Sequence, residues 1–437
     1  MEGKEPKTMK RSVFIKTVSA ILAIIMIFSL AACAKEGPFG TGTTGFAGVT
    51  TLSEGVRAEN ISVSPEALKS GASAYADFAL KLFSEDHKEG VNTLISPFSV
   101  LSALAMTANG AENNTLRQME SVLGLDRETL NNFYLRYARS LPSTKESRLS
   151  LANSIWFTSD QRFTVNTDFL QKNANYFGAD LFQTELNNSA AEAINKWVSS
   201  KTDGMIKNVI DNIPEKSAIM YLINALAFDA EWEDPYTEHQ VRTEKFTCAD
   251  GSEKDADFMY CELNDYLETS MCSGFLKYYK DRNYAFAALL PNEGVSVEEL
   301  LESLTGDRLC TLLSAPQYAT VLTSLPKFTA DYDTEMSELL SELGMPDAFD
   351  EKDADLSGLG TSTNGNIYIS KVIHKTHIEV DEKGTKAGAV TVIETADSAA
   401  PPNDLKYVYL DRPFIYMLID CGSNLPFFIG TMEDVSK

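Results

Sequence analysis

The order in which helical and strand-like patterns occur is the feature of this chain that most constrains its fold. Apolar residues at helical spacing dominate the first half, whereas short apolar runs typical of strands dominate the second half. A parallel sheet built from alternating βαβ units would mix the two patterns along the chain. The segregated order therefore predicts an α+β fold.

Four helices and seven strands can be placed from these patterns. The helices are expected over 72–83, 98–108, 116–123 and 129–141. Ser96 is the expected N-cap of the second helix, and Pro97 its first residue. The strands are expected over 154–157, 219–228, 284–290, 320–325, 367–375, 377–380 and 414–421. No internal repeat is visible, so the chain can form one large domain, although its length alone is compatible with two or three.

The N-terminal segment has the features of an export signal. Lys10 and Arg11 precede an apolar run over 13–32, which is interrupted by Lys16 and ends in Leu-Ala-Ala before Cys33. This ending resembles the bacterial lipoprotein box, which implies that Cys33 carries a diacylglyceryl anchor. A plain secretory signal and a transmembrane helix of marginal length are the alternatives.

These features divide the chain into three parts. Residues 1–32 are expected to be a lipoprotein signal peptide, whose true start is either Met1 or Met9. Residues 33–62 are rich in Gly, Thr, Ser and Ala and are expected to form a lipid-anchored flexible tether. Residues 63–437 are expected to fold. The predicted location is exported, on the outer face of a bacterial membrane, either extracellular or in the cell envelope.

The charge balance excludes one class of partner. Lys and Arg total 38 against 62 Asp and Glu, so the net charge is −24. Such a chain repels phosphate backbones, and we expect no nucleic-acid partner.

The residue patterns of common active sites are absent from the sequence. The four histidines, His87, His239, His374 and His377, do not form H-E-x-x-H, and no Cys/His set has zinc spacing. There is no G-x-S-x-G and no P-loop. We therefore predict no catalytic residue, no metal and no cofactor, with an enzyme that has a dispersed site as one alternative.

The cysteines do not define a disulfide framework. Besides Cys33 there are five, an odd number: Cys248, Cys261, Cys272, Cys310 and Cys421. Cys261 and Cys272 could bridge a hairpin, but sequence alone leaves this pairing open.

Several short stretches together point to a known family. They are 92–99 (NTLISPFS), 195–198 (NKWV), 201–204 (KTDG), 223–225 (INA), 325–328 (LPKF), 343–349 (LGMPDAF), 369–375 (ISKVIHK) and 412–414 (RPF). These stretches resemble the serpin family, and they occur in the family's order. The likeness covers about residues 65–437. It implies one domain of about nine helices around three β-sheets with an exposed reactive-centre loop.

The resemblance also implies a function and the residues that serve it. The expected function is inhibition of a target serine or cysteine protease by a monomeric chain. Ser96, Ser99, Asn224 and His374 match the polar cluster beneath the main sheet that controls whether two strands can part. Trp232 matches the tryptophan at the top of that sheet, where insertion begins.

The segment 382–395 has the pattern of a strand that is not yet in a sheet. Thr385, Ala387, Ala389, Thr391, Ile393 and Thr395 share one face, which is uncharged; Lys386, Gly388, Val390, Val392 and Glu394 share the other, which could meet solvent. The resemblance makes this segment the loop hinge, with Glu382, Gly384, Thr385, Ala387, Gly388 and Ala389 as its residues. Glycines ease a change of backbone conformation and weaken the alternative of a permanent strand.

The family mechanism is a single-use trap. A protease cuts the loop and forms an acyl-enzyme, and the freed loop inserts and distorts the protease. About 14 residues at roughly 3.3 Å each span about 46 Å. Family spacing places the cut at Ser398–Ala399, within a residue or two, and the small side chains there favour elastase-like or subtilisin-like targets. Lys386 stands where inhibitory serpins usually have Glu, which leaves a non-inhibitory binding protein as an alternative.

Overall fold

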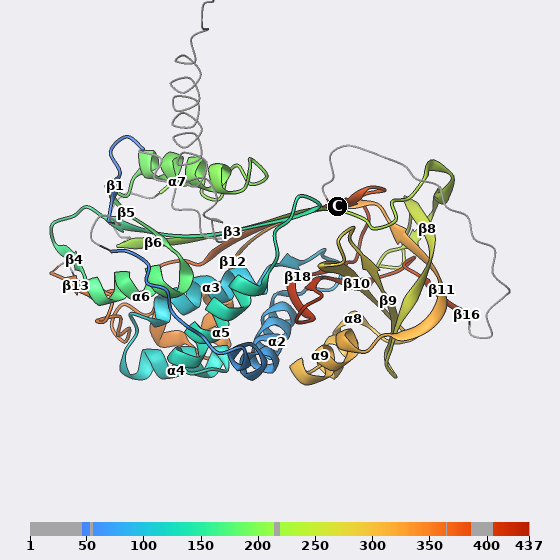
Figure 1. The fold of residues 1–437 in the computed structure, drawn as a ribbon, viewed down its shortest axis with the longest axis horizontal. Coiled ribbons are helices and arrows are strands. Elements are labelled where there is room, and N and C mark those ends of the chain that lie inside the picture. The colour runs from blue at the N-terminus through green and yellow to red at the C-terminus, as the bar shows by residue number, and fades with distance from the viewer. Residues whose placement is uncertain (1–45, 53–55, 214–218, 364, 386–404, 437) are drawn as a thin grey trace, which may run out of the picture. The chain divides into compact units, whose positions relative to one another are not determined.

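The computed structural model describes residues 46–52, 56–213, 219–363, 365–385 and 405–436. Within these residues it contains nine α-helices and three β-sheets (Figure 1). The predicted α+β class is therefore confirmed. The predicted signal peptide, Cys33, and the loop residues Ala387, Gly388, Ala389, Ser398 and Ala399 lie outside the described residues.

The main sheet has seven strands in the order β1-β5-β3-β6-β15-β14-β12. Their bounds are β1 Thr50–Thr51, β5 Asp180–Thr184, β3 Ser147–Thr158, β6 Met220–Glu231, β15 Gly384–Thr385, β14 Ile373–Val380 and β12 Phe328–Glu335. β3 and β6 are antiparallel, as are β12 and β14. Strands that lie before residue 232 thus meet strands that lie after residue 327 in the middle of this sheet.

A second sheet has nine strands in the order β16-β11-β8-β9-β10-β17-β18-β2, with β7 beside β8. Their bounds are β16 Leu405–Tyr409, β11 Gln317–Pro326, β8 Glu253–Glu268, β9 Cys272–Tyr278, β10 Tyr284–Pro291, β17 Phe414–Asp420, β18 Leu425–Met432, β2 Leu94–Ile95 and β7 Val241–Thr247. A third sheet pairs β4 Phe163–Val165 with β13 Gly360–Ser362.

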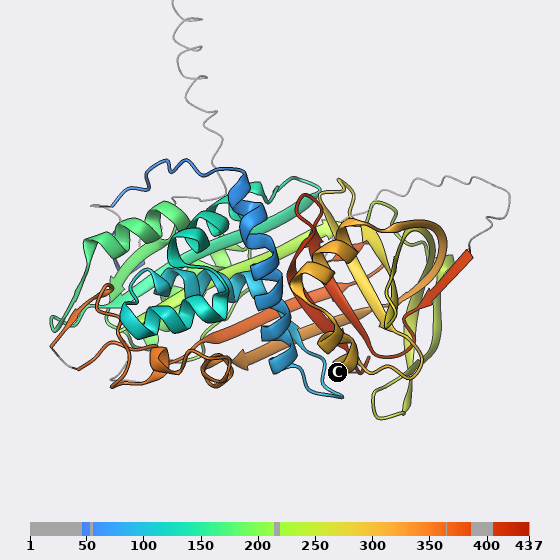
Figure 2. The same ribbon diagram turned by 90° about the horizontal axis from the view of Figure 1, so that it is seen from below.

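The helices cover the main sheet on both faces. Their bounds are α2 Glu66–Asp86, α3 Pro97–Ala108, α4 Asn113–Leu123, α5 Arg127–Ser140, α6 Thr167–Phe177, α7 Asn188–Lys201, α8 Val297–Ser303, α9 Gly306–Ser314 and α10 Ser337–Glu342. Figure 1 shows α7 on one face of the sheet and α3, α5 and α6 on the other. Seen from the latter side, α2 crosses the direction of the strands (Figure 2). We call the side of α7 the outer face and the side of α3 the inner face.

Side-chain caps define where several helices begin. Ser96 accepts a hydrogen bond from the Ser99 N–H, which confirms the predicted N-cap and makes Pro97 the first residue of α3. Asp126 accepts from the N–H groups of Glu128 and Thr129 at the start of α5. Since these caps are local, sequence reasoning can find them.

The first described residues belong to the folded domain rather than to a tether. Thr50 and Thr51 pair with β5, and the Leu52 N–H donates to the Leu181 carbonyl at 2.8 Å. The Phe46 ring lies 6.2 Å from that of Trp156 between ring centroids. Thr50 and Thr51 of the predicted tether are therefore the edge strand of the main sheet, and Phe46 packs against the sheet.

The predicted secondary structure is right where the periodicity is local. The four predicted helices coincide with α2 to α5. The predicted strands over 367–375 and 377–380 are instead one strand, β14, which starts at Ile373 because residues 367–372 have no strand partner. The prediction also missed α6 to α10 and five of the longer strands, β7, β8, β9, β12 and β18.

Candidate functional site

The main sheet is incomplete between β6 and β14. β6 pairs with β3 and β14 pairs with β12, but β6 and β14 are joined only through the two residues of β15. Gly384 lies opposite Glu231, and Thr385 lies between Ala230 and Val380. Among the described residues, the facing edges of 220–229 and 373–379 have no strand partner. We call the space between these two edges the gap.

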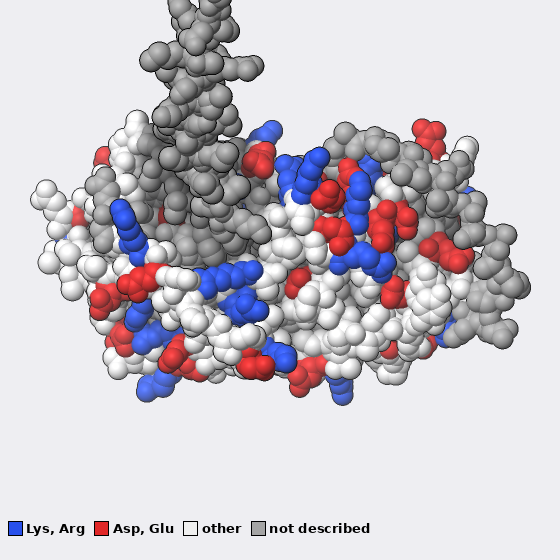
Figure 3. All heavy atoms as spheres, viewed as in Figure 1, with Lys and Arg blue, Asp and Glu red and all other residues white. Residues whose placement is uncertain are grey.

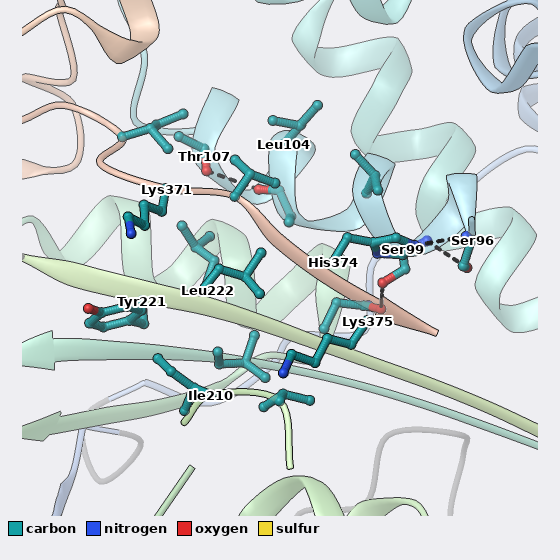
Figure 4. Close-up of a pocket in the computed structure, with 18 of the residues that line it drawn as sticks. Ser96, Ser99, Leu104, Thr107, Ile210, Tyr221, Leu222, Lys371, His374 and Lys375 are labelled. Carbon is teal, nitrogen blue, oxygen red and sulfur yellow. Dashed lines mark hydrogen bonds between the residues drawn. The ribbon is translucent and has the colours of Figure 1, made fainter. Parts of the chain in front are cut away.

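A cavity of ≈ 90 Å³ occupies the gap. Its inner wall is α3, through Ser96, Ser99, Val100, Ala103, Leu104 and Thr107. On the outer side it is bordered by Ile206, Val209 and Ile210, which follow α7. Figure 4 shows Tyr221 and Leu222 on one side of this space and Lys371 and His374 on the other. The gap is thus a narrow slot that runs along two strands and is covered on both faces.

Trp232 and Tyr236 hold the backbone that enters the gap. The Trp232 N–H donates to the Lys383 carbonyl at 2.7 Å, and the Tyr236 N–H donates to the Glu382 carbonyl at 2.8 Å. The Trp232 indole Nε1 donates to the Asp381 carbonyl at 2.9 Å. Trp232 is fully buried, yet its indole bond to the loop base gives it more than the role of an ordinary core aromatic.

β15 is tightly enclosed at the upper end of the gap. Thr385 is 1% exposed, and its Oγ1 lies 2.6 Å from the Tyr279 hydroxyl. Thr385 therefore faces the interior, as the alternating pattern predicts. A Cβ on Gly384 would lie 2.0 Å from the Ala230 carbonyl oxygen, so only glycine allows this approach to β6.

An ion pair lies just before β15. Lys327 Nζ is 2.8 Å from Glu382 and 3.5 Å from Asp257. The hydrogen bond to Glu382 raises the pKa of Lys327. Burial, the largest single cause, would raise the pKa of Glu382, but the Lys327 hydrogen bond, a backbone hydrogen bond and the charge of Lys327 together outweigh it, and the pKa is lowered. Both groups are thus charged at neutral pH and hold the loop base against β12.

The four residues predicted to form a polar cluster do come together at the inner side of the gap. The Ser96 N–H donates to His374 Nε2 at 3.0 Å, and Ser96 Oγ donates to the Phe427 carbonyl at 2.9 Å. Ser99 Oγ donates to Asn224 Oδ1 (Figure 4). Ser96 therefore serves both as the N-cap of α3 and as a member of this cluster.

His374 is held in its neutral form. Its Nε2 accepts the Ser96 N–H, so the ring proton must be on Nδ1. Burial lowers its pKa to about 4, against a weak opposing effect of Asp333. His377, three residues further on, lies on the opposite face of β14 and bonds Asp331 at 2.7 Å.

Asn153 on β3 is a partner of the cluster that sequence reasoning missed. Asn224 Nδ2 donates to Asn153 Oδ1 at 2.6 Å, and Asn153 Nδ2 donates to the Tyr134 hydroxyl at 2.8 Å. The network thus runs from β14 through α3, β6 and β3 to α5. An amide next to the apolar run 155–157 was the available signal, but the predicted strand began at Ser154, one residue after Asn153 and seven residues after the true start of β3.

Other kinds of site have no support in the described part of the chain. No group of three or more His, Cys, Asp or Glu side chains there could hold a metal ion. None of the helices in that part is both long and apolar enough to cross a membrane. The five cysteines from Cys248 to Cys421 are free thiols, so Cys261 and Cys272 do not pair in this structure.

Comparison with known proteins identifies the family. The family model described as "Serpin (serine protease inhibitor)" matches residues 73–435. The chain belongs to the serpin family. Serpins are in general protease inhibitors rather than catalysts, and the predicted family and fold are thus confirmed.

This serpin is similar to curated and solved relatives over most of its length. It is 28% identical over 381 residues to the leukocyte elastase inhibitor of Homo sapiens, covering 82% of this chain and 98% of the relative. It is 44% identical to the thermophilic serpin tengpin in the native state, with a TM-score of 0.83 and coverage of 88% and 99%. Against tengpin in the latent state the identity is 43%, the coverage 86% and 100%, and the TM-score 0.74. The structure is therefore more similar to the native state of that relative than to its latent state.

Proposed function

We propose that this serpin inhibits a serine protease as a single-use substrate, by inserting residues 386–395 into the gap between β6 and β14. The observation that carries the proposal is β15. The first two residues of the expected mobile strand already pair with both β6 and β14, and they point along the gap. β15 is antiparallel to both neighbours, so a continued strand has only one direction in which to run.

The register of β15 fits the length of the gap. Continued residue by residue along β6, it brings Thr395 opposite Met220, the first residue of that strand. Continued along β14, it brings Val392 opposite Ile373, where β14 begins. The segment 386–395 is thus long enough to complete the sheet on both sides.

The same register matches the side chains of the loop to both faces of the gap. It sets Thr391 opposite Asn224 on β6 and opposite His374 on β14, so that its hydroxyl would join the polar cluster. It sets Val390 and Val392 opposite Ala225 and Ile223, which belong to the apolar cluster under α7. In the middle of the inserted strand, the outer face would therefore pack against the apolar cluster under α7. This differs from the expectation from sequence alone that this face could meet solvent.

The mechanism follows from hydrogen bonds that are unmade in the native structure. A target protease cuts the loop and is held as an acyl-enzyme through its own nucleophile. Insertion then pairs the facing edges of β6 and β14, whose backbone groups have no strand partner in the part of the chain that the structure describes. About ten residues at roughly 3.3 Å each carry the attached protease about 33 Å. The serpin supplies no catalytic group.

The proposal also includes the bond that the target protease cuts and the location of the serpin. We place the cut at Ser398–Ala399, where small side chains suit elastase-like or subtilisin-like proteases. The serpin acts as a monomer, exported and lipid-anchored through Cys33 on the outer face of a bacterial membrane. Nucleic acid is not a partner, because the net charge is −24.

The test is incubation with a panel of serine proteases, followed by denaturing electrophoresis. We expect at least one elastase-like or subtilisin-like enzyme to form a complex that survives hot detergent, and trypsin-like enzymes to form none. Cleavage of the loop with continued turnover and no complex would contradict inhibition. That result would favour the alternative of a serpin-fold binding protein.

A further inference from the structure

A thiol and a buried amine lie side by side on the second sheet, outside the gap. Cys261 on β8 is partly exposed, and its Sγ is 4.0 Å from Nζ of Lys277 on β9. The thiol also lies 3.5 Å from the Tyr236 hydroxyl and 3.3 Å from Thr323 Oγ1. The Thr323 hydroxyl donates to the Cys261 carbonyl at 3.0 Å, so its oxygen is free to accept from the thiol.

Lys277 is an unusual residue to bury. It is 2% exposed, and its Nζ has one backbone acceptor, the Asp234 carbonyl at 3.0 Å. The Tyr236 and Trp232 rings lie 4.3 Å and 5.2 Å from Nζ. Burial lowers the pKa of Lys277, although the nearby Cys261, Asp234 and Glu233 oppose this. A lysine in such surroundings supplies the neutral, nucleophilic amine more readily than an exposed one.

The other described cysteines lack these surroundings. Burial raises the pKa of Cys272 and of Cys310, and nearby Asp307 raises the latter further. Burial also raises the pKa of Cys421 to about 12, with Asp420 beside it. Cys248 is buried and lies 3.7 Å from Asp434. Cys261 combines partial exposure with an amine 4.0 Å from its sulfur, close enough to react with an oxidised form of that sulfur.

We propose that Cys261 and Lys277 form an oxidation site for hydrogen peroxide, which converts the pair into a sulfur–nitrogen cross-link between β8 and β9. In the first step the Cys261 sulfur attacks one peroxide oxygen; the S–O bond forms, the O–O bond breaks, and the other oxygen leaves as water after taking up the thiol proton. In the second step the neutral Lys277 amine attacks that sulfur; the S–N bond forms and the hydroxyl leaves as water with an amine proton. Thiol and amine each lose one hydrogen, and one hydrogen peroxide becomes two waters.

The cross-link would lie directly beneath the residues that hold the base of the loop. Tyr236 and Trp232 contact Lys277 and bond the carbonyls of Glu382 and Lys383 through their own N–H groups. The site nevertheless stands on contacts within the second sheet, so it does not depend on the proposed inhibition.

The experiment is peroxide treatment of the full chain, followed by mass spectrometry. We expect the protein to lose two hydrogens, trypsin to stop cleaving after Lys277, and dithiothreitol to reverse both changes. A gain of oxygen on Cys261 without loss of hydrogens would overturn the cross-link. Equal oxidation of Cys261 and Cys421 would overturn the site, whatever the protease panel gives.

Matched variants test whether the cross-link joins the Cys261 sulfur to the Lys277 nitrogen. Cys261→Ser should lose the cross-link completely, whereas Cys421→Ser, which removes another partly exposed thiol, should keep it. Lys277→Met should leave a sulfenic acid that dimedone labels, with no loss of hydrogens. If Lys277→Met does not fold, the blocked tryptic site in the unaltered protein still decides between the outcomes.

Discussion

At the residue scale, the inner side of the gap is lined by buried polar groups, each of which has a hydrogen-bond partner. Sequence reasoning reached Ser96, Ser99, Asn224 and His374 only because the surrounding motifs resemble a known family. Asn153 also bonds Asn224 directly, yet no motif marks it. Its importance depends on burial and on strand register, which bring together residues far apart in the chain.

We expect His374 to make the native state sensitive to acid. Its pKa in the folded protein, about 4, is below the ordinary value of 6.5, so folding favours the neutral ring. The resulting stability is fully present above pH 6.5 and is lost as pH falls through about 4. The loss should reach about 3 kcal/mol of unfolding free energy, measured as the urea midpoint between pH 7.5 and pH 3.5.

His377 provides the matched control on the same strand. His377→Gln should keep the steep loss below pH 6.5, because this side chain is partly exposed. In His374→Gln the unfolding free energy should depend less on pH below 6.5, although this variant should be less stable at neutral pH. An unchanged pH profile in His374→Gln would show that another group carries the effect.

Thr385 tests whether the inner face of the loop must be small and uncharged. Thr385→Arg would bury a guanidinium beside Tyr279, so insertion should fail and the inhibitor should become an ordinary substrate. Thr385→Val has the same size and no charge, and should retain most of the trapping. We would measure the fraction of serpin that forms complex; equal fractions for both variants would refute the assignment of faces.

At the element scale, the strands of the gap show what sequence can and cannot predict. The helices α2 to α5 have apolar residues at helical spacing and were predicted, and so was the alternation of side chains that buries Thr385. The start of β14 was not predicted, because residues 367–372 have a strand-like composition but no strand partner. The strand β1 was not predicted either, because only pairing with β5 distinguishes it from a flexible segment.

Lys386 departs from the family pattern, and the strands offer a reason. Continuing the register of β15 places it opposite Asp229 on β6 and Glu379 on β14, so two carboxylates would flank its ammonium. Lys386→Glu should therefore slow insertion about 2- to 5-fold, by setting like charges across the strands. The insertion rate of Lys386→Ala should lie between those of the unaltered protein and Lys386→Glu.

The rate of complex formation with a trapped protease measures this effect. Adding Asp229→Asn should reduce the difference in rate between the unaltered protein and Lys386→Glu, since one of the two carboxylates is then gone. Faster insertion by Lys386→Glu than by the unaltered protein would contradict the register.

At the scale of the whole molecule, acidic and basic side chains are interspersed on the face that Figure 3 shows. Over the whole sequence, 62 Asp and Glu against 38 Lys and Arg give the net charge of −24. Such an excess would suit the export proposed above, because like charges on the surface keep a protein soluble.

The proposed anchor makes a separate prediction about location. Cys33→Ala should release the serpin from membranes into the medium, because the thiol that would carry the lipid is gone. Cell fractionation with an antibody to the folded domain measures this, and Cys421→Ser serves as the control that keeps membrane retention. Continued retention of Cys33→Ala would count against lipidation and favour an uncleaved transmembrane segment.

The proposed inhibition depends on where the loop goes after it is cut. Backbone amides at the facing edges of β6 and β14 should exchange hydrogen readily in the intact serpin, because these edges lack strand partners among the described residues. After proteolysis within the loop, hydrogen exchange measured by mass spectrometry should slow strongly in peptides that cover 220–231 and 373–380, and stay unchanged in β17 and β18. Exchange in β6 and β14 that is the same before and after cleavage would contradict insertion into the gap.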